Sequence, residues 1–129
     1  MKKALAIFLS VLLIFAVVSC SKGNSESKAS DSSSSADFHI GIATGTVSQS
    51  EDDLRGAEAL IAEYGAVKDG GMIQHVTYPD NFMDEQETTI AVIVGLADDP
   101  KMKAIVVNQA VPGTTEAFRQ VKEKRPDIL

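Results

Sequence analysis

The chain has 129 residues, of which 44% are hydrophobic and 5% aromatic, and its formal net charge at pH 7 is −6. Twelve Lys and Arg residues stand against 18 Asp and Glu residues. This balance argues against nucleic acid as a partner and against binding to anionic lipid surfaces, since both need clustered basic side chains. Cys20 is the only cysteine in the sequence, so it has no partner for an internal disulfide.

The N-terminus has the pattern of an export signal. Two lysines follow Met1, and Ala4–Val18 is an uncharged stretch of 15 residues, shorter than the roughly 20 residues that a membrane span needs. The stretch leads into Val17-Val18-Ser19-Cys20, which resembles the bacterial lipobox, where the cysteine is lipidated and becomes the new N-terminus. We predict that residues 1–19 are a lipoprotein signal peptide. The alternatives are a plain cleaved signal and a short anchor helix with an incidental cysteine.

Export and lipidation at Cys20 would place the protein in the bacterial cell envelope, anchored by lipid to a membrane and facing the periplasm or the cell surface. The segment 20–36 would then be the lipidated cysteine and a flexible tether, because eight of the 16 residues in 21–36 are Ser and none is a large apolar residue. Export also removes the protein from cytoplasmic ATP and NAD(P)H, which weighs against a kinase or a dehydrogenase.

From residue 37 onward, strand patterns alternate with helix patterns. Five apolar residues recur at helical spacing after Ser50, a candidate N-cap, and Gly65 ends that segment. The third strand is continuously apolar, so we expect both of its faces to be covered. The predicted strands are 38–43, 72–77 and 104–108, the predicted helices are 52–64, 82–97 and 115–124, and the recurring apolar residues are Leu54, Ala57, Leu60, Ile61 and Tyr64.

This alternation, with a period of roughly 30 residues, predicts an α/β fold with a doubly wound parallel sheet. Pro126–Leu129 looks like the approach to a fourth strand. We therefore interpret residues 37–129 as a partial α/β ligand-binding lobe with about three βα units. We also expect the sequence to be part of a longer protein.

The exported portion resembles the N-terminal part of a type I periplasmic substrate-binding protein, closest to uncharacterised bacterial lipoproteins related to basic-membrane-protein and sugar-binding receptors. The resemblance rests on Phe38–Gly45, the helix 52–64 and Ile105–Thr114. It covers about 90 residues, and the order of elements after the lipobox carries it rather than one diagnostic motif. It implies a receptor with two lobes around a ligand, of which this chain offers about half of one lobe.

Ligands of open α/β sheets bind beyond the carboxyl ends of the strands. Neutral hydrogen-bonding side chains follow each predicted strand, and the first loop also precedes a helix N-terminus, which suits a carboxylate, a phosphate or a sugar hydroxyl. An aromatic residue beside an amide after the second strand suits a sugar or a nucleoside. The predicted ligand-binding residues are Thr44, Thr46, Ser48, Gln49, Tyr78, Asn81, Asn108, Gln109 and Thr114. Several have purely structural alternatives: Ser48 could cap the helix, Tyr78 and Asn81 could form a turn, and Asn108 could bridge loops.

Enzyme motifs are missing from the sequence. It contains no G-x-G-x-x-G, no G-x-x-x-x-G-K-[ST] and no G-x-S-x-G, and His39 and His75 lie in separate strands without the spacing of a metal site. We expect no enzyme activity, no cofactor and no metal. The favoured function is capture of a small polar ligand, delivered to a membrane permease or a sensor. The alternative is a structural or surface-interaction lipoprotein with no small-molecule ligand, and a hydrolytic enzyme comes third.

Overall fold

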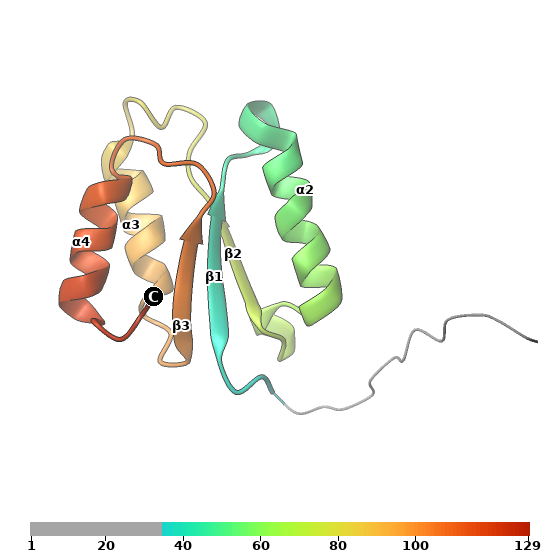
Figure 1. The fold of residues 1–129 in the computed structure, drawn as a ribbon. Helices are drawn as coiled ribbons and strands as arrows, with labels where there is room; N and C mark the ends of the chain where they lie inside the picture. Colours follow the sequence, from blue (N-terminus) through green and yellow to red (C-terminus); the bar gives the residue numbers. More distant parts are fainter. Residues whose placement is uncertain (1–34) are drawn as a thin grey trace, which may run out of the picture. The chain divides into compact units, whose positions relative to one another are not determined.

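The structure is a computed structural model that describes residues 35–129. The predicted signal peptide, Cys20 and most of the predicted tether lie outside the described residues. The described part is a three-stranded parallel sheet with helices on both faces (Figure 1), which confirms the predicted α/β fold class. In chain order the elements are β1 His39–Thr44, α2 Val47–Tyr64, the 3-10 helix η1 Val67–Asp69, β2 Ile73–Thr77, α3 Gln86–Leu96, β3 Met102–Val107 and α4 Thr114–Lys124.

The strand order is β2-β1-β3, so the first strand of the chain is central. Ile42 of β1 pairs with His75 of β2 on one side and with Val106 of β3 on the other. The helix α2 lies on one face of the sheet, and α3 and α4 lie on the opposite face (Figure 1). The chain therefore runs outward from β1 to β2 over one face of the sheet and returns past β1 to β3 over the other face. In open α/β sheets this reversal opens a crevice at the carboxyl ends of the strands.

The larger core lies between the sheet and the two helices α3 and α4. Ile93 and Leu96 of α3 and Val121 of α4 are buried there against Met102 of β3. Gly41 allows this close packing, because a Cβ atom on it would lie 3.0 Å from the Leu96 side chain and 3.3 Å from the sulfur of Met102. The core under α2 is smaller and consists of three buried residues, Ile42, Ala57 and Ile73, with partly buried neighbours.

Two helix starts differ from the predictions. The helix α2 begins at Val47 and is kinked at Ser50, whose φ of −154° and ψ of 86° are extended, as at the N-cap that the sequence predicted there. The helix α3 begins only at Gln86. The residues before it form a turn in which the carbonyl of Asn81 accepts hydrogen bonds from the amides of Asp84 and Glu85, both at 3.0 Å.

The last residues pair with the outer edge of β3. The amide of Leu129 donates to the carbonyl of Lys103 at 2.9 Å, and the amide of Ile105 donates to the carbonyl of Leu129 at 3.0 Å. This is the hydrogen-bond pattern of a parallel neighbour, so the predicted approach to a fourth strand is present as a pairing of one residue. The prediction that both faces of β3 are covered is wrong, because Val106 is 49% exposed.

Candidate functional site

The loops that follow β1 and β2 are joined by one carboxylate. Asp80, in the turn after β2, accepts a hydrogen bond from the hydroxyl of Thr46 and another from the hydroxyl of Ser48 at 2.7 Å. These two bonds lower the pKa of the Asp80 carboxyl, so it is ionised at neutral pH. The N-terminus of α2 therefore already has a carboxylate from the chain itself, at the place where the sequence predicted an anionic ligand or a sugar hydroxyl.

Gln49 connects the same two loops through its side-chain amide. Its Nε2 donates to the carbonyl of Pro79 at 3.1 Å and to the carbonyl of Asp80 at 2.5 Å. Its Oε1 is buried and has no hydrogen-bond partner among the described residues. A buried acceptor without a donor costs about 1–3 kcal/mol. A ligand that donates a hydrogen bond to this oxygen would therefore remove an energetic cost that the two loops otherwise carry.

Tyr78 lies near this oxygen and connects it with the loop after β3 through Gln109. Tyr78 is fully buried, its ring packs edge-on against Phe82 with centroids 5.8 Å apart, and its hydroxyl donates to Oε1 of Gln109 at 3.3 Å. Burial raises the pKa of the Tyr78 hydroxyl, which therefore stays protonated as a donor. A Cβ atom on Gly45 would lie 3.0 Å from Oε1 of Gln49 and 3.2 Å from the Tyr78 hydroxyl. Both polar atoms thus lie close over the backbone of Gly45, at the end of β1.

Asn108 and Thr44 lie on the α2 side of the sheet. Hydrogen bonds to the side chains of Ser50 and Asn108 lower the pKa of the Asp53 carboxyl. Asn108, Thr44 and Asp53 line one end of an open groove of about 400 Å³ that runs between α2 and β3. The loop after β3 is therefore in contact with the first turn of α2 beyond its kink.

Thr44 and His75 form the one contact in this region that resembles a nucleophile with a base. The Thr44 hydroxyl lies 2.9 Å from Nε2 of His75, but its own proton is donated to the carbonyl of Gly45 at 2.8 Å. A hydroxyl has a single proton to donate, so toward His75 it acts as an acceptor. Thr44 is also only 1% exposed. This pair holds β1 to β2 and is not arranged to activate the hydroxyl.

Asn81 and Thr114 lie apart from the loop cluster, which consists of Thr46, Ser48, Gln49, Tyr78 and Asp80. Asn81 is exposed, and its backbone carbonyl closes the turn before α3. Thr114 is buried in the first turn of α4, with a hydroxyl that has no partner among the described residues. The turn before it packs on α3, since a Cβ atom on Gly113 would lie 3.0 Å from the carbonyl of Gln86. Thr114 therefore belongs to the helix pair on the other face of the sheet.

Sequence reasoning missed Asp80, Asp53 and Gly45. In the sequence, Asp80 stands in a turn-like segment between Pro79 and Asn81, and Asp53 stands three residues after the candidate N-cap Ser50, so neither is distinguished as a binding residue. Thr46 and Ser48 lie 34 and 32 residues from Asp80, and Asn108 lies 55 residues from Asp53, so no local pattern could have paired them. Within residues 35–129, no three His, Cys, Asp or Glu side chains gather in a way that could hold a metal ion. The helices in that range are also too short or too polar to cross a membrane.

Comparison with known proteins places the fold and its loops in a family. Residues 38–129 match the family described as "Protein of unknown function (DUF3798)". The chain belongs to the DUF3798 family. The match includes all the strands and helices described above, so the loop cluster and the groove are parts of the DUF3798 region.

Two uncharacterized proteins of Treponema pallidum (strain Nichols) are similar to this DUF3798 chain. One is 47% identical over 95 residues, which are 72% of this chain and 43% of the relative. The other is 57% identical over 37 residues, which are 29% of this chain and 17% of that relative. The chain thus spans less than half the length of the relatives it matches.

A crystal structure of a "Putative transcriptional regulator" from Clostridium difficile 630 has a similar fold. The TM-score is 0.61 at 36% sequence identity, and the match covers 71% of this chain and 27% of the other. That protein too is considerably longer than the region it shares with the DUF3798 chain.

These comparisons correct the resemblance to type I periplasmic substrate-binding proteins. The matched family, the two Treponema relatives and the Clostridium structure are not described as binding proteins of that class. The physical reason is that the resemblance rested on the order of strands and helices and on polar residues at strand ends. Many unrelated α/β proteins share both features, because the fold itself produces them.

Proposed function

We propose that this chain is the ligand-binding part of an exported lipoprotein that captures a small polar ligand for uptake or sensing. Cys20 is the lipid anchor in this proposal, and a membrane permease is the partner that would receive the ligand. The observation that carries the binding role is the buried, unpartnered Oε1 of Gln49, which lies beside the Tyr78 hydroxyl over Gly45 at the carboxyl end of β1.

The charges around these atoms favour one kind of ligand. The carboxylates of Asp80 and Asp53 are held ionised by their hydrogen bonds, and like charges disfavour an anionic ligand beside them. Oε1 of Gln49 needs a donor, which a hydroxyl or an amino group supplies. A sugar, a nucleoside or a similar neutral molecule fits these requirements, and a phosphate or a carboxylate does not.

A thermal-unfolding screen of the full chain tests the proposal. A ligand present at 100 times its Kd stabilises the folded protein by about 2.7 kcal/mol, which raises Tm by about 10 °C or more in a domain of this size. Sugars and nucleosides should include a stabilising compound, and Gln49→Leu should remove its effect. Arg55→Ala, on the exposed side of α2, is the matched control and should respond like the unaltered chain. Panels of sugars, nucleosides, amino acids and peptides that all leave Tm unchanged would contradict the proposal.

A structural or surface-interaction lipoprotein without a small ligand is the second candidate. It is favoured by the hydrogen bonds from Thr46, Ser48 and Gln49 to the turn at Asp80, which use the predicted ligand-binding groups to hold two loops together. In that case the chain unfolds cooperatively, responds to no ligand, and loses stability when Asp80 is replaced by Ala.

The description of the Clostridium protein raises a third candidate, a role in transcription. A DNA-binding surface needs clustered Lys and Arg side chains. This chain is acidic overall, and Asp52 and Asp53 line its groove. We therefore favour ligand capture over contact with nucleic acid.

A further inference from the structure

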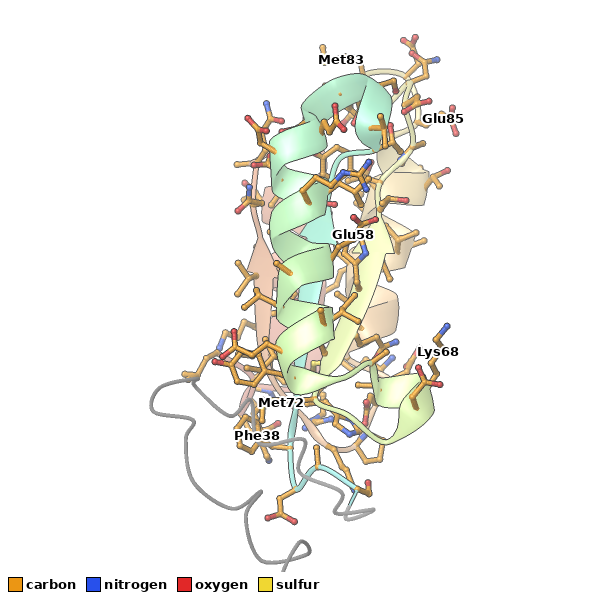
Figure 2. The ribbon with its side chains drawn as sticks, turned by 90° about the vertical axis from the view of Figure 1, so that its right-hand side faces the viewer. Phe38, Glu58, Lys68, Met72, Met83 and Glu85 are labelled. Carbon is orange, nitrogen blue, oxygen red and sulfur yellow. The ribbon has the colours of Figure 1, made fainter. Side chains whose placement is uncertain are left out.

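One half of a sheet face is left open beside α2. This helix packs over β1 and β2, and in Figure 2 it stands in front of the sheet while β3 runs beside it. Val106 of β3 is 49% exposed on this face. Leu60 and Tyr64 of α2 belong to the apolar face predicted from the sequence, yet they are 40% and 47% exposed. Three large apolar side chains from two elements therefore line the same open surface.

These side chains form a continuous groove of about 400 Å³. Its floor is the α2 side of the sheet, with Ile40 and Ile42 of β1 next to Val106, and its wall is the flank of α2. Asp52 and Asp53 line it near the start of α2, and Tyr64, the last residue of α2, lines it at the other end. The groove is thus apolar along most of its length and acidic at one end.

The edge of β3 next to this groove is open to a further strand. Leu129 already pairs there in parallel fashion through Lys103 and Ile105. Alternate residues of a parallel strand turn their backbone groups to the same side. The carbonyl of Ile105 and the amide of Val107 therefore point to this same edge. They are the next backbone groups along β3 beyond those that pair with Leu129.

We propose that the open edge of β3 and the groove together bind a strand–helix segment of polypeptide. The strand runs parallel to β3 and continues the pairing that Leu129 begins. The helix lies in the groove beside α2, with its apolar side on Leu60, Tyr64 and Val106 and with Lys or Arg side chains over Asp52 and Asp53.

Three observations select this occupant. Faces of parallel sheets are normally covered by helices, whose axes pack about 8–10 Å apart, so the free half of this face beside α2 suits one helix. The acidic end of the groove complements basic side chains in that helix. The Treponema pallidum relative that matches over 95 residues has more than half of its length outside the matched region, which is 43% of that protein, so this relative carries further chain that can supply the unit. This inference does not depend on the ligand proposed above.

The test mixes the full chain with the part of that Treponema relative outside the matched region, produced as a separate polypeptide. Titration calorimetry should show a one-to-one complex, and hydrogen exchange should show new protection of the Val107 amide. Val106→Asp and, independently, Leu60→Asp should each weaken binding by at least about tenfold. Both sites are exposed, so circular dichroism should show folded variants. Met83→Asp, at a 61% exposed residue that does not line the groove, should bind like the unaltered chain.

Charge reversal tests the orientation of the helix. Asp52→Lys with Asp53→Lys should weaken the complex and reduce the dependence of its Kd on salt. Failure of the two polypeptides to associate would overturn the proposal, as would a complex that Val106→Asp and Leu60→Asp leave unchanged. Self-association of the chain that these two variants abolish would show that a second copy occupies the groove, and would overturn it as well.

Discussion

Nδ1 of His39 lies 2.5 Å from Oδ2 of Asp99, a contact that joins the first residue of β1 to the turn before β3. His39 is only 7% exposed, and the carboxylate of Asp99 also accepts a hydrogen bond from the amide of Lys101 at 2.8 Å. The pair therefore helps to set how far β1 and β3 are shifted along each other at the amino end of the sheet, where their register is irregular.

The stability of the fold should fall in acid, partly through Asp99. Burial acts to raise the pKa of this carboxyl, but the hydrogen bonds and charges of His39 and Lys101 outweigh it, so the folded pKa lies below its ordinary value. A lowered folded pKa contributes stability above the unfolded value of about 3.9, and this contribution is lost as the pH falls through the folded pKa. Urea unfolding at pH 7 and at pH values below 4 should show a larger loss for the unaltered chain than for Asp99→Asn. Equal losses would exclude Asp99 as a source of the acid sensitivity.

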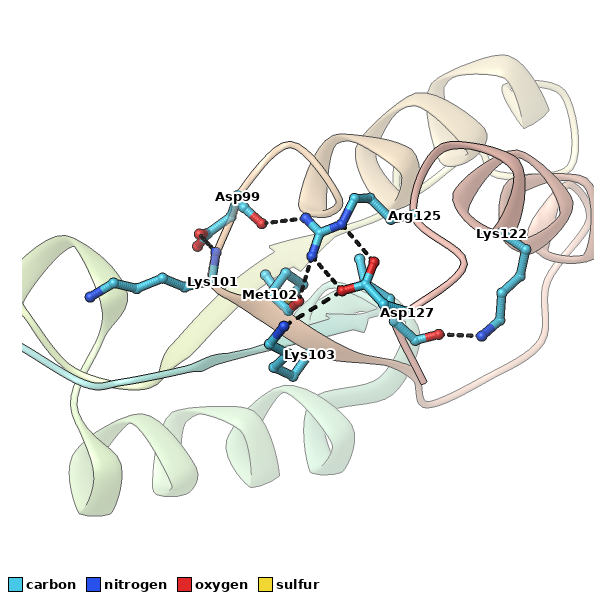
Figure 3. A network of polar contacts seen from close by, with 8 residues as sticks. Asp99, Lys101, Met102, Lys103, Lys122, Arg125 and Asp127 are labelled. Atoms are coloured by element: carbon cyan, nitrogen blue, oxygen red, sulfur yellow. Dashed lines mark hydrogen bonds and ion pairs between the residues drawn. The ribbon is translucent and has the colours of Figure 1, made fainter.

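Arg125 holds the last residues against β3 (Figure 3). Its guanidinium donates to the carbonyl of Asp99 at 3.1 Å, to the carbonyl of Met102 at 3.2 Å, and to both carboxylate oxygens of Asp127 at 2.9 Å. Lysine cannot reproduce this planar arrangement. Arg125→Lys and Arg125→Ala should therefore both lower the free energy of unfolding by about 1–2 kcal/mol.

Hydrogen exchange provides the second measurement for these variants. The amides of Leu129 and Ile105, which join the terminal segment to β3, should exchange faster in both. Arg55→Ala removes an exposed guanidinium with two carboxylate partners and should change stability by less than about 0.5 kcal/mol. Unchanged exchange of Leu129 in Arg125→Ala would show that the pairing with β3 does not depend on this network.

Gly71 should tolerate no side chain. A Cβ atom there would lie 2.2 Å from the carbonyl carbon of Gly65, the residue that follows the last residue of α2, and the backbone cannot move aside as a flexible side chain can. Gly71→Ala should destabilise the fold by at least about 1–3 kcal/mol in chemical denaturation. Gly95→Ala is the matched control, because its Cβ would meet nothing within 4 Å in α3, and it should stabilise the fold by roughly 0.5–1 kcal/mol. A neutral Gly71→Ala would contradict the close approach of the two backbone segments.

Cys20 should determine where the protein is found. In a bacterial host, the unaltered chain should partition with membranes and incorporate labelled palmitate, because the lipobox-like sequence supplies the acceptor thiol. Cys20→Ser should lose the label and leave the membrane fraction. Ser19→Ala, which leaves a small residue before the cysteine, should behave like the unaltered chain. Retention of Cys20→Ser on the membrane would favour an anchor helix over a lipid anchor.

Much of the fold could be predicted from the sequence. Apolar periodicity and the stop at Gly65 placed the strands and most helix ends within a few residues, because these signals are local. Phe82 and Met83 were assigned to a helix, yet they lie in a turn. Apolar residues at these positions fit the first turn of a helix. The carbonyl of Asn81 instead accepts hydrogen bonds from the amides of Asp84 and Glu85, which forms a turn before the helix begins.

The candidate site was predictable only as a set of loops. Thr46, Ser48, Gln49, Tyr78 and Gln109 do lie at the carboxyl ends of the strands, as the general rule for α/β sheets requires. The hydroxyls of Thr46 and Ser48, which were predicted to bind a ligand, instead donate hydrogen bonds to Asp80. Asp80 reaches them only because β1 and β2 are neighbours in the sheet. The resemblance to type I periplasmic substrate-binding proteins was wrong for the same reason. It rested on the order of strands and helices, and that order does not specify which side chains come into contact.

The sequence by itself determined the α/β alternation, the acidic charge, the single cysteine and the lipobox-like motif, because each depends on neighbouring residues or on composition. The tertiary structure decided which polar groups converge and which apolar residues stay exposed. The strand order β2-β1-β3 places Gln49 and Tyr78 together over Gly45 and leaves Val106 beside α2 without a covering helix. Both outcomes depend on contacts between residues that are distant in the chain, and local periodicity carries no information about such contacts.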